Sequence, residues 1–205
     1  MRVVIVDYGM SNLGSISNAL VQCGAENVVI ANNPHELRGA THIILPGVGS
    51  FKDGIDNLNK FGWVEPLRAV TKEEKIPLLG ICLGMQLLAD KGYEGGEVAG
   101  LGLIHGVVDR LKPSSKKEKI PHVGWNEVYP EGKNALFREI APGTDFYFVH
   151  SYHFLPKNKA NILSTTPYCK SFVSGIAQAN IFGVQFHPEK SQRPGFQLLK
   201  NFIDL

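Results

Sequence analysis

The stretch Pro77-Leu-Leu-Gly-Ile-Cys-Leu-Gly-Met-Gln86 decides the fold. Its apolar first half predicts a buried strand, and the good helix formers of its second half predict a helix directly after a sharp turn. Gly80 and Gly84 flank Cys82 two positions away on either side, and small residues there let the backbone bend tightly enough to present one side chain over the edge of a sheet. Free N-H groups and the positive end of the helix dipole stabilise a thiolate at such a position. The stretch therefore predicts a nucleophilic Cys82, although a buried structural cysteine in an ordinary turn stays open on this stretch alone.

Apolar strands are also predicted upstream of this stretch, each followed by helical spacing of apolar residues. These strands cover residues 3–6, 27–31 and 41–46, and the helical segments cover residues 11–21, 35–37 and a longer run that is broken at Gly62 and ends near Val70. Strands that alternate with helices in this way predict a parallel sheet with helices on both faces. Ligands of such sheets bind beyond the carboxyl ends of the strands, where Asp7, Gly47 to Gly49 and Cys82 all fall.

The second half of the chain changes character after Lys91, where glycines interrupt helical patterns. Short β segments are predicted at residues 107–111, 127–129, 146–150, 162–165 and 172–178, followed by a strand at 181–186 and an amphipathic helix at the end of the chain. The prediction is one α/β domain over residues 1–205, with a mostly parallel central sheet, flanking helices and an antiparallel β excursion in the second half.

Composition excludes several classes of function. A chain of 205 residues with 20% charged residues and a formal net charge of +2 does not indicate a nucleic-acid partner. Lys112 to Lys119 reads as a solvated basic loop, with a docking patch for an acidic surface as the alternative. The odd count of 3 cysteines fits a reducing cytoplasm, and we expect neither an exported nor a membrane-spanning protein.

A cysteine nucleophile needs a base, and His187 and Glu189 are the best candidates. We expect an extended His-Pro-Glu after the last strand, which places both side chains on the same side of the chain and lets Glu189 orient the imidazole. His150 and His153 could line the site but have no orienting partner nearby in the sequence. A structural role for His187 and a Cys/His/Glu zinc site remain alternatives.

Gly47-Val48-Gly49 ends the third strand at the same edge of the sheet. Glycines allow a backbone that aims a peptide N-H inward, so the Val48 and Leu83 N-H groups are candidate oxyanion donors. The alternative is a plain turn at the end of a strand.

The combined motifs resemble the triad (class I) glutamine amidotransferase family. The segments that carry the resemblance are Pro46-Gly-Val-Gly49, Gly80-Ile-Cys-Leu-Gly-Met-Gln86 and Gly183-Val-Gln-Phe-His-Pro-Glu189. Three further segments are similar to the glutaminase subunits of imidazole glycerol phosphate synthases, namely Asp7-Tyr-Gly9 with Asn12-Leu13, Pro121-His-Val-Gly-Trp-Asn126 and Tyr147-Phe-Val-His-Ser-Tyr152. Ser11 stands where such subunits commonly have glycine, and Val123 stands where they have methionine.

The resemblance implies a glutaminase with a Cys82, His187 and Glu189 triad and no cofactor or metal. It implies Val48 and Leu83 as oxyanion donors and Gly49 and Gln86 as residues that hold glutamine. The implied partner is a cyclase subunit, a (β/α)8 barrel, in a heterodimer that uses the ammonia to make imidazole glycerol phosphate and aminoimidazole carboxamide ribotide in histidine biosynthesis. The implied interface residues are Asn12, Trp125, Asn126, Tyr147 and Lys190.

Other functions stay open at this stage. A related subunit could supply ammonia for amidino-sugar synthesis in surface polysaccharides, the chain could be a non-catalytic regulatory subunit, or it could be a stand-alone cysteine hydrolase or peptidase. We also expect the isolated subunit to be nearly inactive, because the oxyanion donor on the flexible Gly47-Val48-Gly49 backbone points the wrong way without the partner.

Overall fold

The computed structural model describes residues 1–205. The first half of the chain contains β1 (Val3–Val6), α1 (Leu13–Gln22), β2 (Val28–Ala31), the 3-10 turn η1 (Pro34–Leu37), β3 (His42–Gly47), α2 (Phe51–Lys60), α3 (Val64–Lys72), β4 (Leu78–Cys82), α4 (Leu83–Leu87), β5 (Lys91–Gly92) and β6 (Val98–Ala99). The second half contains β7 (Gly106–Arg110), β8 (His122–Pro130), β9 (Thr144–His150), β10 (Tyr152–Pro156), η2 (Lys159–Asn161), β11 (Ile162–Thr166), β12 (Phe172–Gln178), β13 (Ile181–Val184), η3 (Pro188–Lys190) and α5 (Gln192–Ile203).

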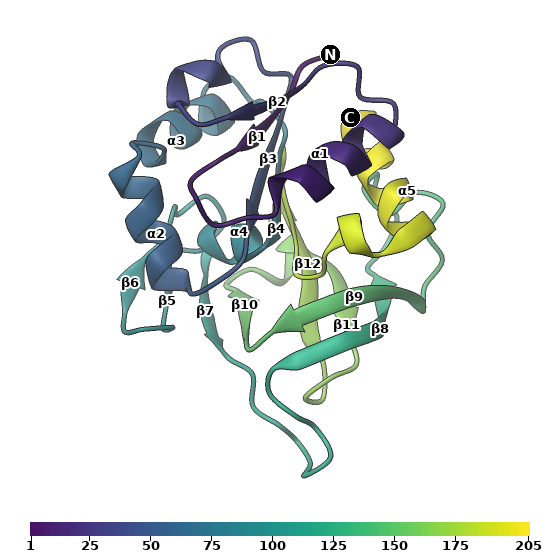
Figure 1. Cartoon of the computed structure of the whole chain (residues 1–205). Coiled ribbons are helices and arrows are strands. Elements are labelled where there is room, and N and C mark those ends of the chain that lie inside the picture. Colours follow the sequence, from purple (N-terminus) through teal and green to yellow (C-terminus); the bar gives the residue numbers. More distant parts are fainter.

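The main sheet has 9 strands in the order β2-β1-β3-β4-β13-β12-β11-β8-β9. Five neighbouring strands pair in parallel, namely β2, β1, β3, β4 and β13. The other four, β12, β11, β8 and β9, continue the same sheet in antiparallel pairing. A second sheet of 4 strands has the order β10-β7-β5-β6. The predicted α/β class with flanking helices is confirmed, and the antiparallel excursion proves to extend the central sheet at one side as well as forming the small sheet (Figure 1).

Two apolar clusters cover the two faces of the parallel half of the sheet. Helices α1 and α5 pack on one face through residues such as Leu20 and Leu198, and helices α2 to α4 pack on the other through residues such as Phe51 and Leu67 (Figure 1). Strands β1 and β4 are buried along their whole length because helices cover them on both sides. Each fully buried large apolar side chain stabilises the fold by about 1.5–3 kcal/mol, so the parallel half is a firm support for the loops at its edge.

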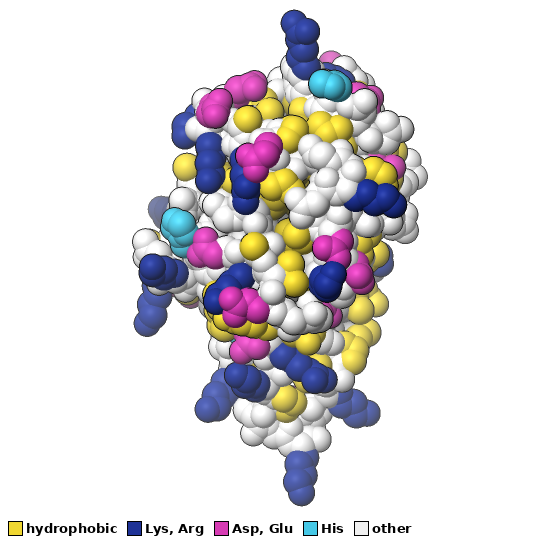
Figure 2. Space-filling view, turned by 90° about the vertical axis from the view of Figure 1, so that its left-hand side faces the viewer, with side chains coloured by type: hydrophobic (Ala, Val, Ile, Leu, Met, Phe, Trp, Pro, Cys, Tyr) yellow, Lys and Arg dark blue, Asp and Glu magenta, His cyan; other side chains and the backbone are white.

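Both chain termini lie at the end of the molecule opposite to β8 and β9 (Figure 1). Basic and acidic side chains are intermixed over the upper and middle parts of the face seen in Figure 2, whereas the lower end shows basic side chains without acidic ones. No helix is long and apolar enough to cross a membrane.

Some predicted elements differ from the observed ones. Strand β8 extends over His122–Pro130, well beyond the predicted residues 127–129, because its pairing with β9 overrides the weak strand propensity of the Gly124 to Asn126 segment. Strand β10 was not predicted at all. Strand β13 ends at Val184 and not at residue 186, because the chain leaves the parallel sheet and His187 N-H donates to the Tyr147 carbonyl of β9 instead.

Candidate active site

Cys82 stands at the junction of β4 and α4 with a strained backbone. Its φ of 54° and ψ of −108° lie outside the regions that L residues prefer, which costs on the order of 1–3 kcal/mol. The flanking glycines permit this bend through close approach: a Cβ on Gly84 would lie 1.7 Å from the Leu45 carbonyl oxygen, and a Cβ on Gly80 would lie 2.7 Å from the Gly84 oxygen. The side chain at the elbow is thus fixed over the carboxyl edge of the sheet.

His187 and Glu189 form a buried pair next to the elbow. The His187 Nδ1 atom lies 2.8 Å from Glu189 Oε1, and both side chains are only 3% exposed. The prediction of an extended His-Pro-Glu is wrong beyond His187, because Pro188–Lys190 forms a 3-10 turn. This turn still brings the two side chains together, and Ser191 Oγ fixes it by donating to the His187 carbonyl at 2.6 Å.

The charge of the site is set by the neighbours of His187. Burial lowers its pKa, but the Cys82 thiolate and then the Glu189 carboxylate raise it, and the balance places the pKa of His187 at about 10. His187 Nε2 is buried without a well-aligned hydrogen-bond partner, although it is close enough to the Cys82 sulfur for this electrostatic coupling. The arrangement therefore favours an imidazolium at His187 beside the Cys82 sulfur, with the Nε2 proton free for transfer.

Gln185 lies on the other side of the sulfur. Its Nε2 atom is 3.7 Å from Cys82 Sγ, and its Oε1 atom accepts a 3.0 Å hydrogen bond from Gln86 Nε2. Sequence reasoning assigned no role to Gln185. The signal was its position two residues before His187, since alternate residues of an extended chain face the same way.

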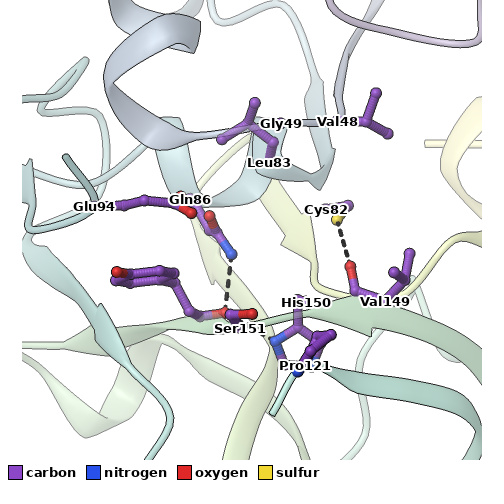
Figure 3. Close-up of a pocket in the computed structure, with 11 residues that line it drawn as sticks. Val48, Gly49, Cys82, Leu83, Gln86, Glu94, Pro121, Val149, His150 and Ser151 are labelled. Carbon is purple, nitrogen blue, oxygen red and sulfur yellow. Dashed lines mark hydrogen bonds between the residues drawn. The ribbon is translucent and has the colours of Figure 1, made fainter.

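A cavity of about 250 Å³ opens above Cys82. It is lined by Val48, Gly49, Cys82, Leu83, Gln86, Glu94, Pro121, Val149, His150, Ser151 and Tyr152. In Figure 3, Val48, Gly49 and Leu83 lie along one side and Val149, His150 and Ser151 along the opposite side, with Cys82 between them. The volume is below the roughly 300–1,000 Å³ of sites for drug-sized ligands, which suits a small substrate.

The structure thus brings all four predicted oxyanion and substrate residues to this cavity, with Cys82 at its base. Sequence reasoning missed Glu94. Its carboxylate accepts a hydrogen bond from Phe51 N-H at 2.9 Å, and burial raises the pKa of this carboxyl group. Glu94 follows the short strand β5, and nothing in its local sequence indicates the cavity. Ser151 and Tyr152 were part of a quoted motif but had no assigned role.

The two predicted oxyanion donors are in different states. Leu83 is the first residue of α4, so its N-H has no partner within the helix. The Val48 N-H, in contrast, donates to the Met10 carbonyl at 2.7 Å and is engaged there. Gly49 has a φ of +116°, and a Cβ on it would lie 2.6 Å from Met10 Cε, so only glycine fits this backbone.

A chain of hydrogen bonds links the Asn126 side chain to the cavity. Asn126 Nδ2 donates to His122 Nε2 at 3.2 Å, His122 Nδ1 lies 3.0 Å from His150 Nε2, and His150 Nδ1 donates to the Tyr152 carbonyl at 2.8 Å. Gln86 Nε2 donates to the same carbonyl at 3.0 Å. Burial lowers the pKa of His122 to about 4 and that of His150 to about 3, so both imidazoles are neutral. The prediction that His150 has no orienting partner nearby in the sequence is wrong, because the Tyr152 carbonyl two residues further on accepts from it, and a second partner, His122, comes from the paired strand β8.

The predicted interface residues lie on the outer side of the same region. Trp125 is 48% exposed and stacks edge-on against Tyr147 with ring centroids 6.0 Å apart, and Lys190 Nζ lies 5.9 Å from the centroid of the Tyr147 ring. Asn12 is exposed and caps α1 by accepting from Ser15 N-H. Trp125, Tyr147 and Lys190 form one cluster, which is joined to the triad because the Tyr147 carbonyl accepts from His187 N-H at 2.9 Å.

The zinc alternative finds no support in the geometry. No group of three or more His, Cys, Asp or Glu side chains is placed to hold a metal ion.

Comparison with known proteins gives a family match over almost the whole chain. The family model described as "Glutamine amidotransferase class-I" matches residues 4–205. The chain is 49% identical over 203 residues to the imidazole glycerol phosphate synthase subunit HisH of Moorella thermoacetica, covering 99% of this chain and 94% of that protein. It is 43% identical to the HisH subunit of Aquifex aeolicus, covering 98% of this chain and 96% of that one.

Solved structures match the fold at low sequence identity. A chain of PurLQS from Thermotoga maritima aligns with a TM-score of 0.74 at 19% identity, covering 99% of this chain and 97% of that chain. A glutamine amidotransferase from the same organism aligns with a TM-score of 0.69 at 21% identity, covering 100% of this chain and 83% of that chain.

Proposed function

This chain belongs to the class-I glutamine amidotransferase family, and from this premise we propose that it is the glutaminase subunit of an imidazole glycerol phosphate synthase. The observation that carries the proposal is the geometry at Cys82, where a strained elbow holds the thiol beside the buried His187 and Glu189 pair. HisH proteins at 41–49% identity over nearly the full chain support this proposal, including the partner and the pathway, histidine biosynthesis. The chain acts as one domain in the cytoplasm.

The triad performs acyl transfer from glutamine. The Cys82 thiolate attacks the side-chain carboxamide carbon of glutamine and forms a carbon–sulfur bond, while the carbonyl oxygen becomes an oxyanion. His187 Nε2 gives its proton to the departing nitrogen, so that ammonia leaves and a thioester remains. Water, deprotonated by His187, then attacks the thioester and releases glutamate. Glu189 keeps the imidazole in the required tautomer and stabilises its positive charge.

The cavity residues divide the remaining work. The Leu83 and Val48 N-H groups hold the oxyanion, and Gly49 and Gln86 hold glutamine. Gln86 Nε2 is already donating to Gln185 and to the Tyr152 carbonyl, so its Oε1 atom remains to accept from the substrate ammonium group. The Glu94 carboxylate at the cavity wall supplies a negative charge for the same ammonium group.

The Val48 N-H explains why the isolated subunit should be nearly inactive. The N-H donates to the Met10 carbonyl, so half of the oxyanion hole is missing until the peptide turns. Loss of one oxyanion donor costs about 10²–10³ in kcat in other enzymes. Binding of the synthase subunit supplies the free energy for the turn.

The partner is the cyclase subunit of the same synthase, a (β/α)8 barrel that forms a heterodimer with this chain. Exposed Trp125, together with Tyr147 and Lys190, offers an aromatic and cationic cluster for it, and we include Asn12 and Asn126 among its contacts. Ammonia passes to the barrel, where imidazole glycerol phosphate and aminoimidazole carboxamide ribotide form.

The test is glutamate release from glutamine by this protein, alone and with the cyclase subunit and its ribotide substrate. We expect strong stimulation by the liganded partner and no activity for the Cys82→Ala variant. Ribotide-independent activity of the free subunit equal to that of the complex would contradict the proposed switch.

The same experiment separates the other functions. Cys82→Ala protein that keeps glutamine-dependent synthesis with the partner would indicate a regulatory subunit. Turnover of peptides or γ-glutamyl compounds without a partner would indicate a stand-alone hydrolase, and a folded protein that no histidine-pathway cyclase stimulates would point to the amidino-sugar relative.

A further inference from the structure

The Tyr8 hydroxyl lies against Gly47 at the end of β3, next to Val48, and has no hydrogen-bond partner. The side chain is fully buried, and its Oη atom is among the buried polar atoms without a partner. A Cβ on Gly47 would lie 2.2 Å from this Oη atom, so the hydroxyl directly contacts the backbone of Gly47. A buried hydroxyl that makes no hydrogen bond lowers the stability of the folded protein. Its position beside Gly47 therefore needs a physical explanation.

The contact between the Tyr8 hydroxyl and Gly47 lies next to the peptide group that carries the proposed oxyanion donor, the Val48 N-H. Gly47 is the last residue of β3, is paired with Cys82 in the sheet, and shares a peptide unit with the Val48 N-H. In a trans peptide the carbonyl and the N-H point in opposite directions. The Val48 N-H now points to the Met10 carbonyl, on the side where residues 8–10 pack against the strand.

Turning this peptide exchanges its two polar groups. When the Val48 N-H turns from Met10 towards the cavity, the Gly47 carbonyl turns towards residues 8–10 and away from solvent. A buried carbonyl needs a donor, and the Met10 carbonyl cannot provide one. The free hydroxyl of Tyr8 is the neighbouring group that can.

We propose that Tyr8 is a positioning residue whose hydroxyl donates to the Gly47 carbonyl after the peptide has turned. The inference rests on the proposed function, because it assumes that Val48 is an oxyanion donor. Tyr8 thereby stabilises the active orientation of the strand, and its unpaired hydroxyl destabilises the resting orientation. The main chain of Tyr8 is fixed for this role, since its carbonyl accepts from Asn57 Nδ2 at 3.1 Å.

Protonation does not interfere with this role. Burial, followed by the nearby Cys82 thiolate, raises the pKa of the Tyr8 phenol well above its ordinary value. The phenol therefore keeps its proton, and remains a donor, at every pH at which the protein works.

The Tyr8→Phe variant tests the proposal because it should affect the two orientations in opposite directions. In the free subunit, removal of the unpaired hydroxyl should raise the melting temperature by about 2–4 °C. In the complex with the cyclase subunit and its ribotide, loss of the hydrogen bond should lower kcat for glutamine hydrolysis about three- to tenfold with KM unchanged. The rate of Cys82 alkylation by iodoacetamide, which needs no oxyanion hole, should stay the same.

Tyr168→Phe is the matched control. Unlike the Tyr8 hydroxyl, the Tyr168 hydroxyl makes two hydrogen bonds. It donates to the Lys119 carbonyl at 2.7 Å and accepts from Lys119 N-H at 2.9 Å. Its removal should lower the melting temperature and leave kcat unchanged.

Each result has a distinct meaning. Unchanged kcat in a Tyr8→Phe complex, or a loss of kcat together with a lower melting temperature, overturns the role of Tyr8 while the proposed function stands. A wild-type complex without stimulated glutaminase activity overturns the proposed function and the role of Tyr8 with it.

Discussion

The two sides of the cavity differ in how completely they are built. Cys82, His187 and Glu189 are buried side chains, His187 is bonded to Glu189, and all three follow central strands of the sheet, so the proposed triad is already assembled in the free subunit. The facing strand at Val48 and Gly49 is exposed, and its N-H is engaged by Met10. The contrast teaches that, under the proposed mechanism, control need not act on the nucleophile. Reorienting the one Val48 peptide group opposite to it would be sufficient.

We call the side of the cavity formed by Cys82, His187 and Glu189 the prebuilt side, and the side formed by Val48 and Gly49 the switchable side. The largest effect should come from a substitution on the prebuilt side. Cys82→Ala should lower glutamine hydrolysis in the complex by about 10⁴-fold or more, because no other group can form the thioester. The measurement is kcat in the presence of the cyclase subunit and ribotide. Ammonium chloride supplied in place of glutamine should restore synthesis by the mutant complex, and failure to do so would mean that the substitution damages more than the glutaminase reaction.

Glu189→Gln should have the next largest effect. The neutral amide loses the charge that stabilises the imidazolium and can hold the wrong tautomer of His187, so kcat should fall about 10²- to 10⁴-fold with little change in KM. Glu26→Gln, an exposed carboxamide substitution outside the site, is the control. Equal activities of the two variants would remove Glu189 from the triad.

The switchable side should respond more moderately. A Gly49→Ala variant places a Cβ at a φ of +116° and against Met10, so the strand should no longer take its functional shape and kcat in the complex should fall about ten- to a hundredfold. Gly96→Ala has comparable backbone strain, at a φ of +115°, but nothing within 4 Å of the added Cβ. Both variants should lose stability, and only Gly49→Ala should lose activity. Normal stimulation of Gly49→Ala would contradict the division into two sides.

The pH dependence of stability should report on the prebuilt side alone. His187 has a folded-state pKa of about 10 against an ordinary value of 6.5, so its contribution to folding is fully present below pH 6.5 and is lost as the pH rises through 10. The difference in unfolding free energy between wild type and His187→Gln should therefore shrink as the pH rises towards 10. A difference that grows over this interval would show that His187 is not held as an imidazolium.

The smallest effect is expected for Trp125→Ala in the free subunit. Trp125 is 48% exposed, so its removal should change the free energy of unfolding by no more than about 0.5 kcal/mol. Trp63, which is fully buried, is the matched control, and Trp63→Ala should cost about 3–5 kcal/mol. The same Trp125→Ala protein should bind the cyclase subunit more weakly in a titration, and unchanged affinity would remove Trp125 from the interface.

The sequence was most informative where function depends on a local turn. The two glycines around Cys82 and the spacing of His187 and Glu189 each indicated one part of the proposed triad, because each pattern is local. That the two parts meet was expected from the combined motifs and the family resemblance. We expected the Val48 N-H to point away from the site in the free subunit, but the local sequence did not indicate its acceptor, since Met10 approaches from a loop far away in the chain.

Pairing across the antiparallel half was also beyond the sequence. His150 has its partner His122 on the neighbouring strand, and Glu94 reaches the cavity from the turn after a short strand of the second sheet. Register between β8 and β9 is set by contacts along the whole hairpin and not by a local pattern.

The position of the two chain ends has a practical consequence for protein engineering. Both termini lie at the end of the molecule opposite to β8 and β9, and hence away from the Trp125 cluster (Figure 1). Purification tags or fluorescent labels on either terminus should leave the docking surface clear. A single polypeptide that joins this subunit to its synthase would need a linker that runs along the length of the glutaminase, so two separate genes, or a long connecting segment, suit this geometry better than a short fusion.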